Sequence, residues 1–275
     1  MEPQIIKIIR NIHTVSYDNK HYDCKCRGKI RNQKIVPLVG DYCKFDPEKK
    51  VIEEILPRKN EFKRPPVANI DQAILVTSMI EPDFSLNLLD RFLLTMELNN
   101  IEVIICITKK DITPLETQKH IENTLDYYKN LGYKIVSNQD IDTLKKLLSE
   151  KTSVFVGQTG AGKSTLLNKL YPSLSLKVGE ISLALGRGKH TTRVVSLFEQ
   201  DLAKVLDTPG FSALDFETIN TEQIRNAFKE FKKFPCPFKD CTHTKEKECA
   251  VKKAVLDNKI LKTRYDNYIK FIEKR

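Results

Sequence analysis

The spacing of the hydrophobic residues changes twice along this chain. From residue 5 to about residue 56 the apolar residues form short runs, separated by turn-favouring pairs such as Asp18-Asn19 and Asp46-Pro47. Short strands divided by turns in this way are typical of a small all-β barrel. The charged stretch at residues 59–66 ends in a pair of prolines, which favour an extended chain, so we expect a linker there.

The middle of the chain alternates apolar runs with helical patterns. Its short runs are rich in β-branched residues and are mostly apolar on both faces, as buried parallel strands are. These runs predict strands at residues 72–78, 103–108, 134–137, 153–156 and 203–206. Helical spacing predicts helices at residues 86–99, 118–130, 141–150 and 163–170. The alternation predicts a doubly wound α/β sheet.

The composition of the chain indicates what kind of partner it binds and where in the cell we expect it. The last part, from residue 215, is Lys-rich and mostly helical, with a helix expected around residues 256–272. The net charge of +10 is carried mainly by the two ends, at +4 over residues 1–62, +1 over residues 63–214 and +5 over residues 215–275. This distribution favours a polyanionic partner. No membrane-spanning run and no secretory signal is evident, so we expect a cytoplasmic protein whose seven cysteines are thiols or metal ligands.

A complete phosphate-binding loop lies between the expected strand at residues 153–156 and the helix at residues 163–170. Its glycines let backbone N–H groups converge on phosphate oxygens, and the helix N-terminus adds positive potential. Lys163 would bridge the β- and γ-phosphates, and Ser164 would bind Mg²⁺ through its hydroxyl. The loop consists of Gly157, Gln158, Thr159, Gly160, Ala161, Gly162, Lys163, Ser164 and Thr165.

A tetrapeptide upstream of this loop is the candidate for reading a guanine base. Its residues are Thr108, Lys109, Lys110 and Asp111. The Asp111 carboxylate can accept hydrogen bonds from N1–H and from the 2-amino group of guanine, a donor pair that adenine lacks. Thr108 stands where an asparagine is usual and makes fewer hydrogen bonds, so we expect a reduced margin of guanine selection. Ser137, after the next strand, is either a second base-contacting residue or part of a simple turn.

The γ-phosphate and Mg²⁺ would meet residues downstream of the loop. In the segment Asp207-Thr208-Pro209-Gly210, Asp207 supplies a carboxylate for the magnesium shell and Gly210 supplies an N–H for the γ-phosphate. The residues from 179 to 193 have the glycines, cations and threonines of a mobile switch. Thr192, or its neighbour Thr191, is the expected magnesium ligand from this segment.

The group that orients the attacking water is not where it usually lies. Phe211 occupies the position after Gly210, where a glutamine is usual, and phenylalanine cannot position water. His190 is the nearest polar candidate for the catalytic role, because its pKa range suits contact with water or developing charge. The other interpretation of His190 is an exposed loop histidine.

The order of these motifs is inverted. In an ordinary GTPase the base-reading motif comes last, whereas here it precedes the phosphate loop, so the order implies a circularly permuted chain. Permutation lets the segment after Asp207 run directly into the C-terminal part. Loss of the γ-phosphate contact at Gly210 would then move the C-terminal part directly.

Two groups of cysteine and histidine residues are candidates for metal binding. The first has the three thiolates and one imidazole of a closed structural zinc site, in a segment with little apolar content of its own. It consists of Cys236, Cys241, His243 and Cys249. The second group lies in the barrel, where a reduced core explains the same thiols equally well. It consists of His21, Cys24, Cys26 and Cys43.

A basic face in the barrel is a candidate for RNA contact, with a solvated rim as the alternative. Tyr17 and Tyr22 lie near it in the sequence and offer stacking surfaces. Its cations are Lys20, Lys25, Arg27, Lys29, Arg31 and Lys34.

The full set of motifs resembles the RsgA family of circularly permuted, small-subunit-dependent GTPases. The resemblance rests on the Asp111 tetrapeptide, the phosphate loop, the switch at residues 188–192, the segment at residues 207–211 and the Cys/His quartet. It implies an OB-fold barrel over residues 1–62, a permuted P-loop GTPase domain over residues 63–214 and a zinc-binding helical domain over residues 215–275. It also implies GTP as substrate, Mg²⁺, one structural Zn²⁺, and a role in late maturation of the 30S subunit through contact with 16S rRNA.

Three function classes stay open at this point. An RNA-stimulated GTPase that is monomeric off the ribosome is the expectation that the combined motifs favour. A GTP-dependent RNA-binding switch with little intrinsic turnover is the second, because Phe211 replaces the usual glutamine. A P-loop ATPase or kinase is the third, and competition between ATP and GTP would separate it from the first two.

Overall fold

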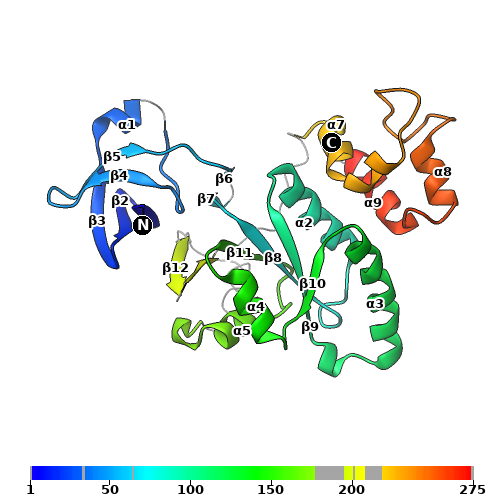
Figure 1. The fold of residues 1–275 in the computed structure, drawn as a ribbon, viewed down its shortest axis with the longest axis horizontal. Coiled ribbons are helices and arrows are strands. Elements are labelled where there is room, and N and C mark those ends of the chain that lie inside the picture. Colours follow the sequence, from blue (N-terminus) through cyan, green and yellow to red (C-terminus); the bar gives the residue numbers. More distant parts are fainter. Residues whose placement is uncertain are drawn as a thin grey trace, which may run out of the picture. The chain divides into compact units, whose positions relative to one another are not determined.

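The computed structural model describes residues 2–32, 35–63, 65–176, 195–200, 202–207 and 219–273. They fall into two compact units. The first unit takes in the described residues within 1–74, 140–156 and 163–211. The second takes in those within 75–139, 157–162 and 212–275. The chain first crosses between them inside strand β8 (Gln72–Ser78), which Figure 1 labels.

The N-terminal strands of the first unit form the predicted barrel. They are β1 (Gln4–Ile9), β2 (Ile12–Tyr17), β3 (Lys20–Cys26), β4 (Cys43–Asp46) and β5 (Val51–Ile55), hydrogen-bonded in the order β1-β2-β3-β5-β4, with helix α1 (Gly28–Asn32) after β3 (Figure 1). Backbone bonds from Ile5 N to Asp41 O (2.8 Å) and from Cys43 N to Pro3 O (3.0 Å) join β1 to the segment that enters β4. The buried core of the barrel contains Ile5, Val15, Cys24, Ile30, Cys43 and Ile52.

The stretch at residues 59–66, predicted as an extended linker, is extended at residues 61–63, but it is paired and packed. This segment contains β6 (Glu61–Lys63), which pairs antiparallel with β7 (Pro66–Ala68). Phe62 and Val67 are buried, and the Asn60 side chain exchanges hydrogen bonds with the backbone of Ile70 at 2.8 and 2.9 Å. Burial of the apolar residues and the bonds across the pair hold the segment in place.

The rest of the first unit contains further strands and helices. Strand β11 (Thr152–Val156) lies beside the start of β8 and runs parallel to β13 (Ala203–Asp207). Strand β12 (Ser196–Gln200) pairs antiparallel with both β13 and β1, so the sheet continues into the barrel. Nothing in the apolar spacing had predicted β12. Helices α4 (Ile141–Leu148) and α5 (Lys163–Leu170) and the 3-10 turn η2 (Pro172–Leu174) complete the unit.

The second unit contains the end of β8 and further parallel strands. Strand β9 (Glu102–Thr108) lies between β8 and β10 (Lys134–Ser137), and β9 and β10 are parallel. Helices α2 (Leu86–Leu98) and α3 (Leu115–Asn130) and the 3-10 turn η1 (Lys110–Ile112) connect the strands. The predicted sheet strands and helices all form, and their bounds differ from the prediction by no more than three residues.

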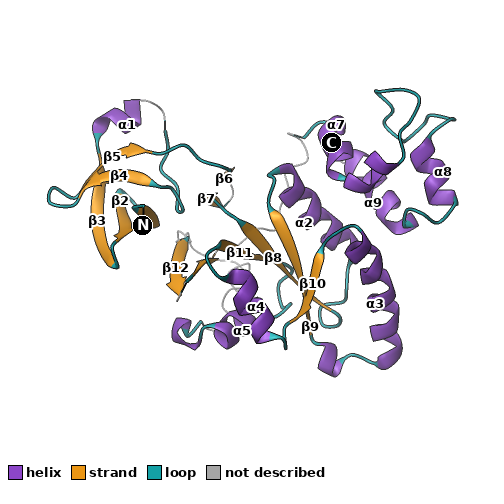
Figure 2. Cartoon of the chain, in the orientation of Figure 1, coloured by secondary structure: helices purple, strands orange, loops and turns teal. Residues whose placement is uncertain are grey.

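The C-terminal part of the second unit is helical, as Figure 2 shows. Its elements are α7 (Thr221–Ala227), the 3-10 turn η4 (Lys229–Lys233), α8 (Ala250–Leu256) and α9 (Lys262–Glu273). The predicted helix around residues 256–272 is wrong at its start, because α8 ends at Leu256 and Asn258 adopts a left-handed conformation (φ 57°). None of the helices in the described parts of the chain is long and apolar enough to cross a bilayer.

A buried polar network fastens these C-terminal helices to α2 and α3. The Arg264 guanidinium donates to Asp90 at 2.6 Å and forms an ion pair with Glu230. Asp90 also accepts from the Tyr128 hydroxyl and from the Asn267 amide, both at 2.7 Å. The Arg264, Asp90 and Glu230 side chains are at most 2% exposed, so the one guanidinium offsets negative charge of both carboxylates inside the protein.

Candidate nucleotide and metal sites

The glycine loop at residues 157–162 lies in the second unit, against the end of β8. Gly157, Gly160 and Gly162 have φ values of 140°, 82° and 94°, which L side chains rarely adopt. A Cβ added to Gly157 would lie 2.0 Å from the Val76 carbonyl oxygen, so any other residue would displace the backbone. The predicted glycines are therefore required by the conformation of the loop itself.

Thr108 ties the base-reading tetrapeptide to this loop. It ends β9, is 2% exposed, and its hydroxyl donates to the carbonyl oxygen of Ala161 at 2.7 Å. The Thr108 carbonyl accepts from Met79 N at 3.2 Å, which fixes the end of β9 to the end of β8. The same hydroxyl lies 3.5 Å from the Thr77 carbonyl oxygen, so Thr108 contacts both the phosphate loop and the end of β8.

The other base-site residues lie at the same ends of the strands. Lys109 adopts a left-handed conformation (φ 59°) and its ammonium donates to the Glu81 carbonyl. Lys110 and Asp111 are exposed in η1, where the Asp111 carboxylate is open to a ligand. Ser137 ends β10 in register with Ile107 of β9. The Thr108–Asp111 loop and the Ser137 turn therefore follow neighbouring parallel strands at one edge of the sheet.

In the first unit, the predicted phosphate-site residues lie at the end of β13 and at the start of α5. Strands β11 and β13 are parallel, with Val154 opposite Leu206. Asp207, the last residue of β13, therefore lies at the same end of the sheet as the carboxyl end of β11. Helix α5 begins at Lys163, and burial lowers the pKa of the Lys163 ammonium to about 8. Ser164 is buried in the first turn of α5, while Thr165 beside it is exposed.

Several predicted residues cannot be placed. His190, Thr191 and Thr192 of the expected switch, together with Gly210 and Phe211, lie outside the described residues. Within the glycine loop, Gln158 is half-buried and Thr159 is exposed.

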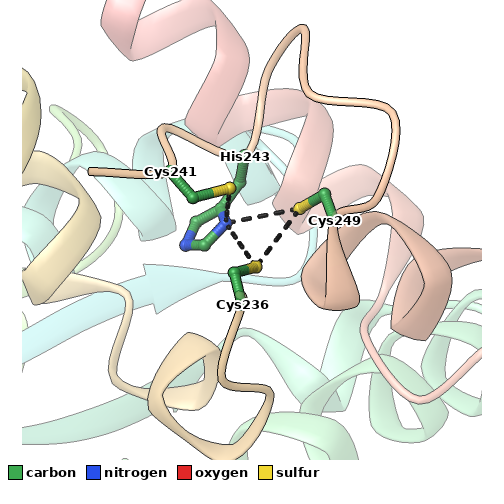
Figure 3. A group of neighbouring side chains, drawn as sticks. All are labelled: Cys236, Cys241, His243 and Cys249. Carbon is green, nitrogen blue, oxygen red and sulfur yellow. Dashed lines mark hydrogen bonds between the residues drawn. The ribbon is translucent and has the colours of Figure 1, made fainter. Parts of the chain in front are cut away.

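The C-terminal Cys/His quartet converges as a metal site would (Figure 3). The ligand atoms lie within 4.8 Å of one another. The Cys236 and Cys249 sulfurs are 3.7 Å apart, and His243 Nδ1 lies 3.3 to 3.4 Å from all three sulfurs. Zinc bond lengths place ligands at the corners of a tetrahedron with edges of about 3.5 to 3.8 Å, so these residues fit Zn²⁺. Burial lowers the pKa of His243, which keeps its imidazole neutral for coordination.

Surrounding groups hold the quartet in shape. The Tyr265 hydroxyl donates to the His243 carbonyl at 2.6 Å, and the Cys249 sulfur accepts from Lys252 N at the start of α8. The Phe231 ring packs edge-on against the His243 ring at 5.3 Å. Contacts of this kind orient metal ligands before the metal arrives.

The barrel thiols belong to a core. Cys24 and Cys43 are buried there, and burial raises their pKa values to about 11 and about 12. Across the described ranges, only the C-terminal quartet groups metal ligands closely enough to hold an ion. The reduced-core interpretation of the barrel cysteines is the one that the structure supports.

The barrel cations leave both of their interpretations open. Lys20, Lys25 and Lys29 are exposed, while Arg27 pairs with Glu53 at 3.4 Å. Tyr17 and Tyr22 both pack against the Phe45 ring. Arg31 has no described side chain, and Lys34 lies outside the described residues.

Comparison with known proteins gives consistent matches along the chain. The model of the RsgA N-terminal domain matches residues 2–51, and the RsgA GTPase model matches residues 55–217. A protein of Oceanobacillus iheyensis named small ribosomal subunit biogenesis GTPase RsgA 2 is 46% identical, over 99% of this chain and 96% of its own. A protein of Streptococcus agalactiae named small ribosomal subunit biogenesis GTPase RsgA is 44% identical, over 99% and 94%.

Two solved structures are similar over the same length. YjeQ from Thermotoga maritima superposes with a TM-score of 0.88 at 34% identity, covering 99% of this chain and 97% of its own. YloQ, described as a circularly permuted GTPase, superposes with a TM-score of 0.81 at 38% identity, covering 99% and 94%. The predicted permuted fold is thus confirmed.

Proposed function

Because this chain belongs to the RsgA GTPase family, we propose that it hydrolyses GTP to GDP and phosphate during late maturation of the 30S ribosomal subunit. The observation that carries the nucleotide site is the hydrogen bond from Thr108 to Ala161. It joins the base-reading tetrapeptide to the phosphate loop, although the permutation places 45 residues between the two motifs in sequence. One nucleotide can then contact both.

The proposed site uses these residues in separate roles. Asp111 accepts the guanine donors, the backbone of residues 157–162 binds the phosphates, and Lys163 offsets their charge. Ser164, Thr192 and Asp207 would hold Mg²⁺, which when bound neutralises charge that develops on the phosphates. His190 would orient the attacking water. The Gly210 N–H would donate a hydrogen bond to the γ-phosphate, so this contact would exist only with GTP bound.

The remaining parts of the proposal concern the partner. We propose that the quartet holds one structural Zn²⁺ and that the barrel and the C-terminal part contact 16S rRNA, because the basic excess lies in these parts. We propose a cytoplasmic protein, monomeric off the ribosome, with the domain bounds given above. The coupling of Gly210 to the C-terminal part also stays a prediction, because residues 208–218 are not described.

Phosphate release under multiple turnover tests this proposal against its alternatives. The protein should release phosphate from GTP and not from ATP, and Lys163→Ala should abolish nucleotide binding. Tight binding of GTP with no turnover in the presence of small subunits would instead indicate a binding switch. Equal displacement of a fluorescent guanine nucleotide by ATP and GTP would indicate an ATPase or kinase.

A further inference from the structure

A groove on the surface of the Cys/His segment has no role in the nucleotide site. It encloses about 200 Å³ between α7, η4 and the loop at residues 234–241. Phe234 and Phe238 line it, and Phe238 is 59% exposed. No other phenylalanine is exposed in the described parts of the chain. Keeping this ring in water costs free energy unless a partner covers it.

The charge of the groove indicates what such a partner would be. Three cations line it, namely Arg225, Lys232 and Lys239, and Arg225 is paired with Glu222 at 3.5 Å. Cys236, Cys241 and His243 of the quartet form another part of the lining, so the cations that are left for a ligand are the exposed Lys232 and Lys239. An exposed aromatic ring with two exposed lysines in the same groove suits a ligand with a flat apolar face and attached negative charge. An unpaired nucleotide has both features, whereas a double helix presents neither a free base face nor a shape that enters so small a groove.

The loop that carries Phe238 is fixed before any ligand arrives. The Arg225 guanidinium donates to the carbonyl oxygens of Lys239 (3.0 Å) and Cys241 (3.1 Å), and Cys241 N donates to the Phe238 carbonyl (3.2 Å). Phe238 also lies between two members of the quartet, Cys236 and Cys241. Because the loop is already ordered, binding costs little conformational entropy.

We propose that this groove binds an unpaired nucleotide of RNA, with its base stacked on Phe238 and its phosphates beside Lys232 and Lys239. The inference rests on the proposed RNA partner and adds to it a defined contact for a single-stranded or bulged nucleotide. An acidic polypeptide is the competing occupant, since its carboxylates would pair with the cations but would not cover the exposed Phe238 ring.

The absence of tryptophan from this chain allows a direct test. Phe238→Trp places one fluorophore in the groove of the full-length zinc-loaded protein, and a stacked base quenches it. Leu256→Trp is the matched control, because Leu256 is 83% exposed in the same part of the chain and does not line the groove. The probes are a single-stranded oligouridylate of about ten nucleotides, an RNA duplex of equal length and polyglutamate.

We expect saturable quenching of Phe238→Trp by the single strand, and little by the duplex or in the control. Phe238→Ala should bind the labelled single strand at least about fivefold more weakly, while Phe238→Trp should match the native protein. Equal quenching at both positions, stronger quenching by polyglutamate, or an affinity of Phe238→Ala within twofold of native would overturn the proposal. Zinc content confirms that each variant is folded. GTP hydrolysis by the same preparations is read separately, so its loss would count against the proposed function and not against the groove.

Discussion

The buried network around Arg264 makes a quantitative prediction about stability. Arg264→Met keeps a long apolar side chain, which can still pack beside the Phe228 ring that lies 4.6 Å from the guanidinium carbon. It removes the charge that compensates Asp90 and Glu230, whose side chains are at most 2% exposed. Removing one partner of a buried ion pair costs about 3 to 5 kcal/mol. For a protein of this size that corresponds to a fall of about 6 to 20 °C in the unfolding temperature.

The same variant should depend on pH in a defined direction. Burial raises the pKa of Asp90, and Arg264 acts against that rise. Without Arg264 the folded-state pKa of Asp90 lies further above its unfolded value. A group with a raised folded-state pKa stabilises the fold below its unfolded pKa and loses that contribution as pH rises through the folded pKa. The deficit of Arg264→Met should therefore be smaller at pH 5 than at pH 8.

Differential scanning calorimetry at both pH values, with zinc present, measures these effects. Lys262→Met is the matched control, because Lys262 lies on the same helix and pairs with Asp266 at 2.8 Å in an exposed position. Its cost should be less than about 1 kcal/mol. Adding Asp90→Asn to Arg264→Met should recover part of the loss. An Arg264→Met protein that unfolds within 2 °C of native at pH 8 would refute the reasoning.

Four further predictions concern the two sites. Thr108→Val should weaken GTP binding about fivefold or more by leaving the Ala161 carbonyl unpaired, while Thr108→Ser should bind normally in fluorescence titrations. Since the pKa of Lys163 is lowered to about 8, GTP binding should take up a proton at pH 8.5 and weaken from pH 7 to pH 9, and calorimetry in two buffers showing no uptake would disprove this. His190→Ala should bind GTP normally but lose subunit-stimulated hydrolysis, so normal turnover would remove its catalytic role. Cys249→Ser should reduce bound zinc from one ion per chain to nearly none, as atomic emission would measure.

The sequence predicted best where local chemistry decides the structure. Strands β8, β9 and β11 are buried on both faces, so their apolar residues show in the sequence whatever they pair with. The glycine loop and the Cys/His quartet were equally visible, because steric demand at Gly157 and ligand chemistry restrict the residue types. Thr108 was identified as a departure from the usual asparagine, but its bond to Ala161 depends on the fold.

The sequence predicted least where distant segments decide. Strand β12 exists because β13 and β1 lie on either side of it, and β6 because β7 folds back on it. Neither pairing leaves a strong local pattern. The Arg264 network joins residues up to 177 positions apart. Its signal in the sequence was that Arg264 lies at helical spacing from Tyr268 and Phe271, which are buried. That spacing could have marked Arg264 as a buried cation.

Phosphate release from GTP, titrated with purified small ribosomal subunits at several salt concentrations, tests the central claim most directly. Large subunits serve as the matched RNA-rich control. The rate should rise to a plateau with small subunits only, and more subunits should be needed as salt screens the basic ends of the chain. A rate that stays at its basal value, or that rises equally with both subunits, would contradict a GTPase of small-subunit maturation.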